Sequence, residues 1–389
     1  MRKISANYIF PISQKPLKNG ILILDDNGYI IDIIDTKGNL IESENLEFYN
    51  GILVPGFINT HCHLELSHLK NVMPKHTGLP GFLLQLSKLR VSEKDEIISN
   101  IINADKEMQR NGIVAVGDVS NNELTFETKS KSKIKYHTFI EIFDINNNTE
   151  EVLNYAYKLR ETATECNLSS SIVPHAPYTV SSTLFNKIFE ISRESNSIIS
   201  IHNQENQDEN KLYINKSGKF FESGIVPINF EATGFNSLPS IVKYLMTENN
   251  KILVHNTFTT EQDIKYANKY LTKLYWVICP NANLYIENKL PDIEMFIKNN
   301  QNITIGTDSL ASNNKLSILN ELITISNKFP SIPLELLLSW ATINGAVSLN
   351  LNKFLGSFEK NKKPGVNLLQ NINFSDMRLT DNTMVKALI

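Results

Sequence analysis

The feature that most constrains the fold of this chain is an alternation of short apolar runs with amphipathic helical stretches, which starts near residue 52. Such repetition is typical of parallel strands joined by helical crossovers. Eight runs are predicted to be strands: residues 52–59, 113–119, 135–143, 170–174, 198–201, 251–254, 275–279 and 303–306. Eight strand–helix units predict an α/β fold in which the strands close into a (β/α)8 TIM barrel. An open doubly wound sheet is the alternative, but no glycine-rich phosphate-binding turn follows the first predicted strand.

The two ends of the chain differ from this central region. Residues 1–50 contain short apolar runs bracketed by turn signals such as Asn27-Gly28, so this segment is predicted to be β-rich. The tail from Leu355 onward is β-like again. We therefore expect the tail to pair with the N-terminal segment.

Composition and charge exclude several classes of protein. Lys and Arg number 38 against 41 Asp and Glu, so no basic excess exists to neutralise nucleic-acid phosphates. Hydrophobic residues at 41% and charged residues at 20% rule out disorder, collagen and coiled coil. The three cysteines cannot form a disulfide framework, which favours a reducing compartment. With no signal-peptide core and no run of 18 apolar residues, a cytoplasmic protein without membrane contacts is expected.

The placement of histidine is the strongest functional signal in the sequence. The chain has eight histidines, and four of them lie at or just beyond the ends of predicted strands: His61, His175, His202 and His255. A barrel carries its active site at the C-terminal ends of its strands. These four side chains are therefore expected to meet in one site.

A metal site is predicted around His61 and His63. Residues i and i+2 of an extended segment point to the same side, so both imidazoles can bind one ion. Two half-exposed surface histidines would be the alternative for an isolated pair, but His202 and Asp308 end other strands nearby. Asp308 could ligate the metal and accept a proton, or it could cap a following helix.

Three further side chains are candidates for catalysis or substrate binding. Glu205 follows His202 by three residues and could reach a substrate beside the metal, or it could be a surface residue of a polar stretch. His255 could act in catalysis or be a hydrogen-bonded core histidine. His175 lies between two prolines in a rigid loop that suits substrate binding, with packing under that loop as the alternative.

Taken together, these segments resemble the amidohydrolase superfamily, in particular the branch that holds cytosine, guanine, S-adenosylhomocysteine and aminofutalosine deaminases and the triazine hydrolases. The resemblance covers nearly the whole chain. It rests on five ordered motifs, which lie at residues 54–63, 175–179, 202–205, 279–284 and 306–309 with 316–322.

The resemblance implies a barrel over residues 55–354 and a small β-sandwich built from residues 1–54 and 355–389. It implies one divalent metal ion, Zn²⁺ or else Fe²⁺, with four ligands: His61, His63, His202 and Asp308. Binuclear members carry a bridging lysine after the fourth strand, where this chain has His175. Relatives are often dimers, so a homodimer is an expectation from the resemblance alone.

The resemblance also implies a hydrolase acting on carbon–nitrogen bonds of cyclic amidines. It would deaminate an aminopurine nucleoside or a similar heterocycle, with 6-aminofutalosine, S-adenosylhomocysteine and methylthioadenosine as candidate substrates. Glu205 would carry a proton from water to the ring nitrogen, His255 would hydrogen-bond the attacking oxygen, and Asp308 would take the second proton. The residues implied to contact the substrate are His175, Glu65 and Tyr178.

Two other functions fit the same fold. An amide or halide hydrolase, for example on a chlorotriazine-like substrate, would use the same metal, but it does not require the proton shuttle that Glu205 offers. A non-catalytic binding protein would have no need of a complete ligand set. Metal content separates the binding protein from the two enzymes, and ammonia release separates the two enzymes.

Overall fold

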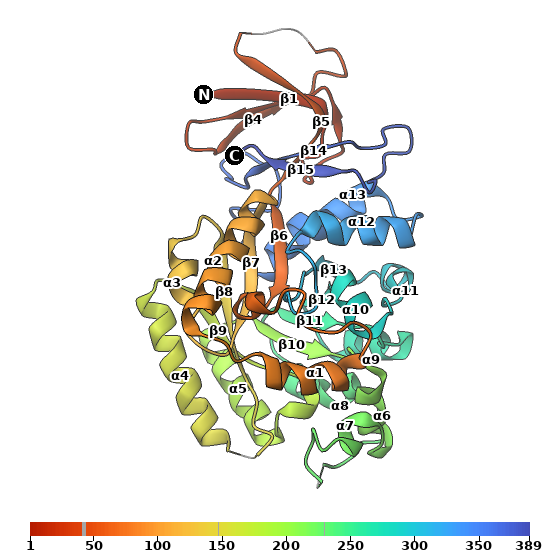
Figure 1. The fold of residues 1–389 in the computed structure, drawn as a ribbon. Helices are drawn as coiled ribbons and strands as arrows, with labels where there is room; N and C mark the ends of the chain where they lie inside the picture. Colours follow the sequence, from red (N-terminus) through yellow and green to blue (C-terminus); the bar gives the residue numbers. More distant parts are fainter. Residues whose placement is uncertain (41–43, 147, 229) are drawn as a thin grey trace.

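The computed structural model describes residues 1–40, 44–146, 148–228 and 230–389, and it is a mixed α/β protein with two parallel four-stranded sheets (Figure 1). The first sheet has the order β6 (Phe57–Cys62), β7 (Ile113–Ser120), β8 (Lys135–Ile142) and β9 (Ser169–Pro174). The second has the order β10 (Ile199–Asn203), β11 (Lys251–His255), β12 (Leu274–Ile278) and β13 (Asn302–Ile305). These elements confirm strands at the eight predicted positions.

Helices follow the strands along the chain and cover the two sheets (Figure 1). The α-helices are α1 (Gly78–Leu89), α2 (Lys94–Arg110), α3 (Phe126–Lys131), α4 (Thr149–Glu165), α5 (Ser182–Ser195), α6 (Gln207–Asn215), α7 (Lys219–Glu222), α8 (Ser237–Ile241), α9 (Glu261–Tyr270), α10 (Pro280–Glu287), α11 (Ile293–Lys298), α12 (Ile318–Lys328), α13 (Leu334–Ser339) and α14 (Gly345–Ser348). The 3-10 helices are η1 (Leu64–Leu69), η2 (Pro177–Thr179) and η3 (Val242–Leu245), and η4 (Trp340–Asn344) is a π-helical turn. Helices α2, α4 and α5 confirm that amphipathic helical stretches lie between the predicted strands.

Helix α5 shows why these segments are helical. The hydroxyl of Ser181 accepts a hydrogen bond from the backbone N–H of Leu184, which caps the first turn. Leu184 and Ile188 lie one turn apart and are both buried, so one face of the helix packs on the sheet. The helix ends at Asn196, which adopts the left-handed conformation that asparagine tolerates.

The predicted first strand, residues 52–59, is wrong in one respect, because the chain forms two strands there. β5 (Leu46–Pro55) belongs to the terminal sheet and β6 begins at Phe57 in the parallel sheet, with Gly56 between them. A Cβ atom at Gly56 would lie 2.3 Å from Val114 and 2.7 Å from the carbonyl oxygen of Pro364. The chain leaves the terminal sheet and enters the parallel sheet at this residue, and only glycine fits the close contacts made there.

Strands from both chain ends pair in a third, mixed sheet of seven strands, drawn at the top of Figure 1. Its order is β15 (Met384–Ala387), β14 (Val366–Gln370), β5, β1 (Arg2–Ile9), β3 (Ile21–Leu24) and β4 (Ile30–Ile34), with β2 (Leu17–Lys18) paired to β1. β14 pairs with β5 in antiparallel register, so the predicted pairing of the tail with the N-terminal segment is confirmed.

The ends of the two parallel sheets meet through backbone hydrogen bonds. The N–H of His202 donates to the carbonyl oxygen of His175 at 3.0 Å, which joins the β9 and β10 segments. On the other side, the N–H groups of Thr307 and Asp308 donate to the carbonyl oxygen of His61, each at 3.1 Å. These contacts bring the C-terminal ends of non-adjacent strands together at one place.

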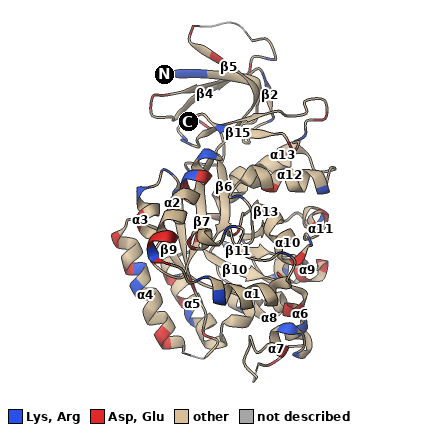
Figure 2. Cartoon of the chain, in the orientation of Figure 1, with Lys and Arg blue, Asp and Glu red and all other residues tan. Residues whose placement is uncertain are grey.

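Charged side chains of both signs occur on the same surface helices, as on α4 in Figure 2. Helix α4 carries Glu150 and Glu151 in its first turn and Lys158 and Arg160 further along. Within the described parts of the chain, no helix combines the length and apolarity needed to cross a bilayer.

Candidate metal centre and active site

Three imidazoles converge at the C-terminal ends of β6 and β10. The Nε2 atom of His63 lies 3.1 Å from Nε2 of His61 and 3.3 Å from Nε2 of His202. Their ligand nitrogens all fall within 4.8 Å of one another. The i, i+2 spacing thus places His61 and His63 together as predicted, and His202 joins them from the neighbouring sheet.

Asp308 supplies a carboxylate to the same cluster. Its Oδ1 atom lies 3.7 Å from Nε2 of both His61 and His63. Asp308 has a backbone φ of 55°, which turns the chain back toward β6, and its Oδ2 accepts a hydrogen bond from Ser312. The next helix, α12, begins only at Ile318, where Ser317 is the cap, so the alternative role of Asp308 as a helix cap is excluded.

The four side chains fit a divalent metal ion of the zinc type. Two nitrogen ligands of one tetrahedral zinc lie about 3.3 Å apart, since each Zn–N bond is about 2.0–2.1 Å. The separations of 3.1 and 3.3 Å between the histidine nitrogens match this edge. Metal binding also needs unprotonated nitrogens, and burial lowers the pKa of His63 to about 4.

Hydrogen bonding fixes which nitrogen His202 offers. Its Nδ1 donates to the carbonyl oxygen of His175 at 2.8 Å, so the lone pair is on Nε2, which faces His63. Glu141 lies on the same side, with Oε1 3.4 Å from that Nδ1, and Asn121 donates to its Oε2 at 3.2 Å. A second group of three residues, Glu141, His175 and His202, is close enough to hold an ion. Because Nδ1 of His202 already carries a hydrogen, this second group lacks a third ligand, and the geometry favours one ion.

Glu205 and His255 lie beside the metal cluster. Oε2 of Glu205 is 3.6 Å from Nε2 of His255, and the ring centroid of His255 is 5.5 Å from that of His202. Glu205 is only 6% exposed, so its alternative role as a surface glutamate is excluded. Burial raises the pKa of Glu205 well above its usual value, because desolvation disfavours the charged carboxylate.

The residue that orients His255 is Asn283, which the sequence analysis did not single out. Nδ1 of His255 lies 2.9 Å from Oδ1 of Asn283, while the amide nitrogen of Asn283 donates to the carbonyl oxygen of His255 at 3.3 Å. The amide oxygen therefore accepts the Nδ1–H, and the lone pair of His255 is directed at Glu205. Asn283 lies in one of the quoted motifs, but its role depends on a contact across 28 positions.

We predict that Asn283→Leu lowers kcat by roughly tenfold, because an unsatisfied imidazole N–H costs about 1–3 kcal/mol and releases the ring from its tautomer. Asn283→Asp keeps the acceptor oxygen and should retain most of kcat. Steady-state kinetics of the two variants at equal metal content make the comparison. Equal loss in both variants would show that the hydrogen bond to Nδ1 is not what matters.

The three residues expected to contact substrate have different surroundings. Nδ1 of His175 lies 3.0 Å from the hydroxyl of Thr179, and its ring is 4.9 Å from that of His202. Tyr178 is buried in an apolar cluster and its ring lies 4.3 Å from that of Phe220. His175 therefore borders the metal cluster, and Tyr178 lies beside His175, with ring centroids 6.4 Å apart.

Glu65 is the most buried of the three candidates, at 3% exposed. One of its oxygens accepts a hydrogen bond from the backbone N–H of Asn121 at 2.9 Å, and the other faces Arg90 at 3.4 Å. Burial raises the pKa of Glu65 to about 7. Its protein contacts fit a structural carboxyl group as well as a substrate-binding one.

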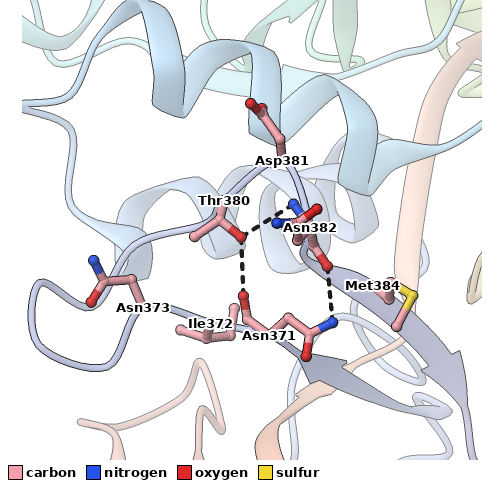
Figure 3. A pocket seen from close by; sticks show the side chains of 7 residues that line it. All are labelled: Asn371, Ile372, Asn373, Thr380, Asp381, Asn382 and Met384. Carbon is pink, nitrogen blue, oxygen red and sulfur yellow. Dashed lines mark hydrogen bonds between the residues drawn. The ribbon is translucent and has the colours of Figure 1, made fainter.

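A pocket of about 680 Å³ lies far from these residues, in the connection between β14 and β15 (Figure 3). Asn371 and Asn382 pair there, and Thr380 donates to the carbonyl oxygen of Asn371. The carboxylate of Asp381 accepts a hydrogen bond from Asn327. The polar groups of this pocket thus satisfy one another, and the chemistry-bearing side chains gather at the metal cluster instead.

Comparison with known proteins agrees with this geometry. A family model described as the amidohydrolase family matches residues 52–387. The chain is similar to an adenosine deaminase of Helicobacter pylori, at 24% identity over 377 residues, covering 92% of this chain and 90% of that protein. Its fold is similar to that of H. pylori aminofutalosine deaminase in complex with methylthio-coformycin (TM-score 0.82, 22% identity, 97% of this chain and 94% of the other). It is also similar to an adenosine deaminase of Xanthomonas campestris with bound zinc (TM-score 0.75, 21% identity, 94% and 84%). Because this family model spans most of the sequence, the chain belongs to the amidohydrolase family, as the motifs predicted.

Proposed function

We propose that this protein is a metal-dependent aminohydrolase that deaminates an aminopurine nucleoside or a similar heterocycle and releases ammonia. The observation that carries the proposal is the position of Glu205 and His255, 3.6 Å apart and beside three converging imidazoles. An amidine carbon becomes electrophilic when the adjacent ring nitrogen is protonated, and a buried carboxyl group can deliver that proton. An adenosine deaminase and an aminofutalosine deaminase among the similar proteins support this substrate class.

His61, His63, His202 and Asp308 would hold one divalent ion. We assign Zn²⁺, since three neutral imidazoles and a carboxylate are ligands that zinc prefers. The zinc-bound adenosine deaminase of similar fold supports this choice. When bound, the ion supplies Lewis acidity that activates a water molecule at neutral pH.

The protein's own groups then move the protons. Glu205 takes a proton from the water at a carboxylate oxygen and gives it to the ring nitrogen; it later relays to the leaving amine the second water proton, which Asp308 first takes up. Nε2 of His255, kept free of hydrogen by Asn283, accepts a hydrogen bond from the attacking water. Asp308 takes the second proton at Oδ1. His175, Tyr178 and Glu65 are assigned to substrate contacts.

In the same proposal, residues 55–354 form a closed (β/α)8 barrel and residues 1–54 with 355–389 form a small β-sandwich. The hydrogen bonds at both seams between the two parallel sheets support closure. One apolar core shared by side chains of β1, β3, β4, β5 and β14 supports a terminal sheet that folds over on itself.

The test is ammonia release by purified, zinc-replete protein on a panel of adenosine, S-adenosylhomocysteine, methylthioadenosine, 6-aminofutalosine, guanine and cytosine. We expect ammonia from at least one of the four aminopurine nucleosides and none from cytosine. Release from cytosine or guanine alone would change the substrate class. Silence across the panel with metal bound would favour the amide or halide hydrolase.

A further inference from the structure

A fully buried ion pair lies directly behind the metal-binding turn. Nζ of Lys129, on α3, is 2.5 Å from Oδ2 of Asp118, on β7, and both side chains are 0% exposed. The ammonium group also donates to the hydroxyls of Ser120 at 2.8 Å and Thr138 at 3.3 Å. The three polar partners of Lys129 thus hold it between β7 and β8.

The other oxygen of Asp118 reaches the metal-binding segment. Asp118 pairs with Cys62, the residue between His61 and His63, in the register of β7 and β6. Its Oδ1 accepts a hydrogen bond from the backbone N–H of Leu64 at 2.8 Å. Leu64 follows His63 directly and begins the turn η1, so this bond fixes the backbone on which the His63 imidazole is carried.

A buried ion pair contributes little net stability, because desolvation of the two charges offsets their attraction. An apolar pair of similar volume would fill the same space. Specificity of conformation is the better-supported use of such pairs, and here the conformation concerned is the turn that aims a metal ligand.

We infer that Asp118 is a positioning residue for His63, that Lys129 holds Asp118 in place, and that the pair sets the metal affinity of the site. The inference rests on the proposed function only in taking His63 as a ligand. It assigns to α3 and β7 a part in metal binding, although neither contributes a ligand.

Two double variants separate positioning from stability. Asp118→Leu with Lys129→Met removes both charges and the acceptor for Leu64, whereas Asp118→Asn with Lys129→Met removes the charges and keeps an amide oxygen for that N–H. Both metal-free proteins should melt near the wild-type temperature. In competition with a fluorescent chelator, the Leu/Met variant should bind Zn²⁺ about 10–100-fold more weakly, and the Asn/Met variant should bind close to wild type.

Lys251 provides the matched control. Lys251 is another fully buried lysine, and its Nζ donates to the carbonyl oxygens of Thr247 and Asn249 at 2.6 Å each. It is the first residue of β11, whereas His255 is the last. Lys251→Met should lower the melting temperature and leave Zn²⁺ affinity unchanged. If Lys251→Met loses as much Zn²⁺ affinity as the Leu/Met variant, general destabilisation explains the effect of the Asp118 substitution, and the inference is overturned.

The remaining outcomes are also decisive. Zn²⁺ affinity at the wild-type level in the Leu/Met variant, or equal weakening of both double variants, would overturn the role of Asp118. If the Leu/Met variant does not fold, the single variant Asp118→Asn replaces it. In that variant Lys129 competes with the N–H of Leu64 for one amide oxygen, so it should bind Zn²⁺ more weakly than the Asn/Met variant. Equal Zn²⁺ affinities of these two variants would overturn the inference. If the single variant His63→Ala binds Zn²⁺ as tightly as the wild-type protein, the proposed metal site itself is refuted.

Discussion

Glu205→Gln should lower kcat by about 10²–10⁴ while leaving metal content and melting temperature unchanged. Glutamine has the shape of glutamate but cannot accept and release the proton that the ring nitrogen requires. Glu205 is not among the four side chains of the metal cluster, so its replacement should not disturb the ion. A kinetic assay of ammonia release measures kcat, and elemental mass spectrometry measures the metal content of the variant.

Glu205→Asp is the control for this variant. It keeps a titratable carboxyl group in the same buried position but withdraws it by one methylene, so it should retain more activity than the glutamine variant. A Glu205→Gln protein with more than about a tenth of wild-type kcat would remove Glu205 from the proton shuttle.

Asp308→Ala should lose both turnover and metal. The change removes the carboxylate that lies 3.7 Å from two of the clustered histidines, and losing a ligand should exceed the roughly 10–100-fold loss of affinity that follows removal of an outer partner. Isothermal titration of the metal-free protein with Zn²⁺ measures the affinity. Activity should fall in step with occupancy.

Asp144→Asn is a matched control for Asp308→Ala, because Asp144 is also a buried aspartate. Its carboxylate accepts hydrogen bonds from Ser181 and Thr149, which ties the starts of α4 and α5 together and does not involve the metal cluster. This variant should lose stability and keep its metal. Wild-type occupancy in Asp308→Ala would contradict the ligand role of Asp308.

The clustering of the candidate metal ligands was predictable from the sequence because it depends on local patterns. An extended segment puts His61 and His63 on one side, and parallel strands bring their C-terminal ends together, so His202, His255 and Asp308 had to meet them. The same logic placed the seven parallel strands that follow the first. It failed at Gly56, where the continuous apolar pattern hides a passage from one sheet to the next.

Contacts between distant side chains were not predictable in this way. Asn283 acts on His255 through a hydrogen bond that only the folded chain creates, and no periodicity distinguishes it from Asn281 two positions earlier. Lys129 looks like an ordinary surface lysine of a short helix, since its sequence neighbours are polar and charged. Its burial against Asp118 follows from the packing of α3 on the sheet, which a single sequence does not contain.

If this protein is the proposed aminohydrolase, ammonia release depends on one metal ion held by this cluster. The most direct measurement is the rate of ammonia release from the best nucleoside of the panel as Zn²⁺ is added back to chelated protein. We expect no release without metal, a linear rise in rate, and a plateau at one equivalent of Zn²⁺ per chain. Equal rates in metal-free and zinc-replete protein, or a plateau only at two equivalents, would contradict it.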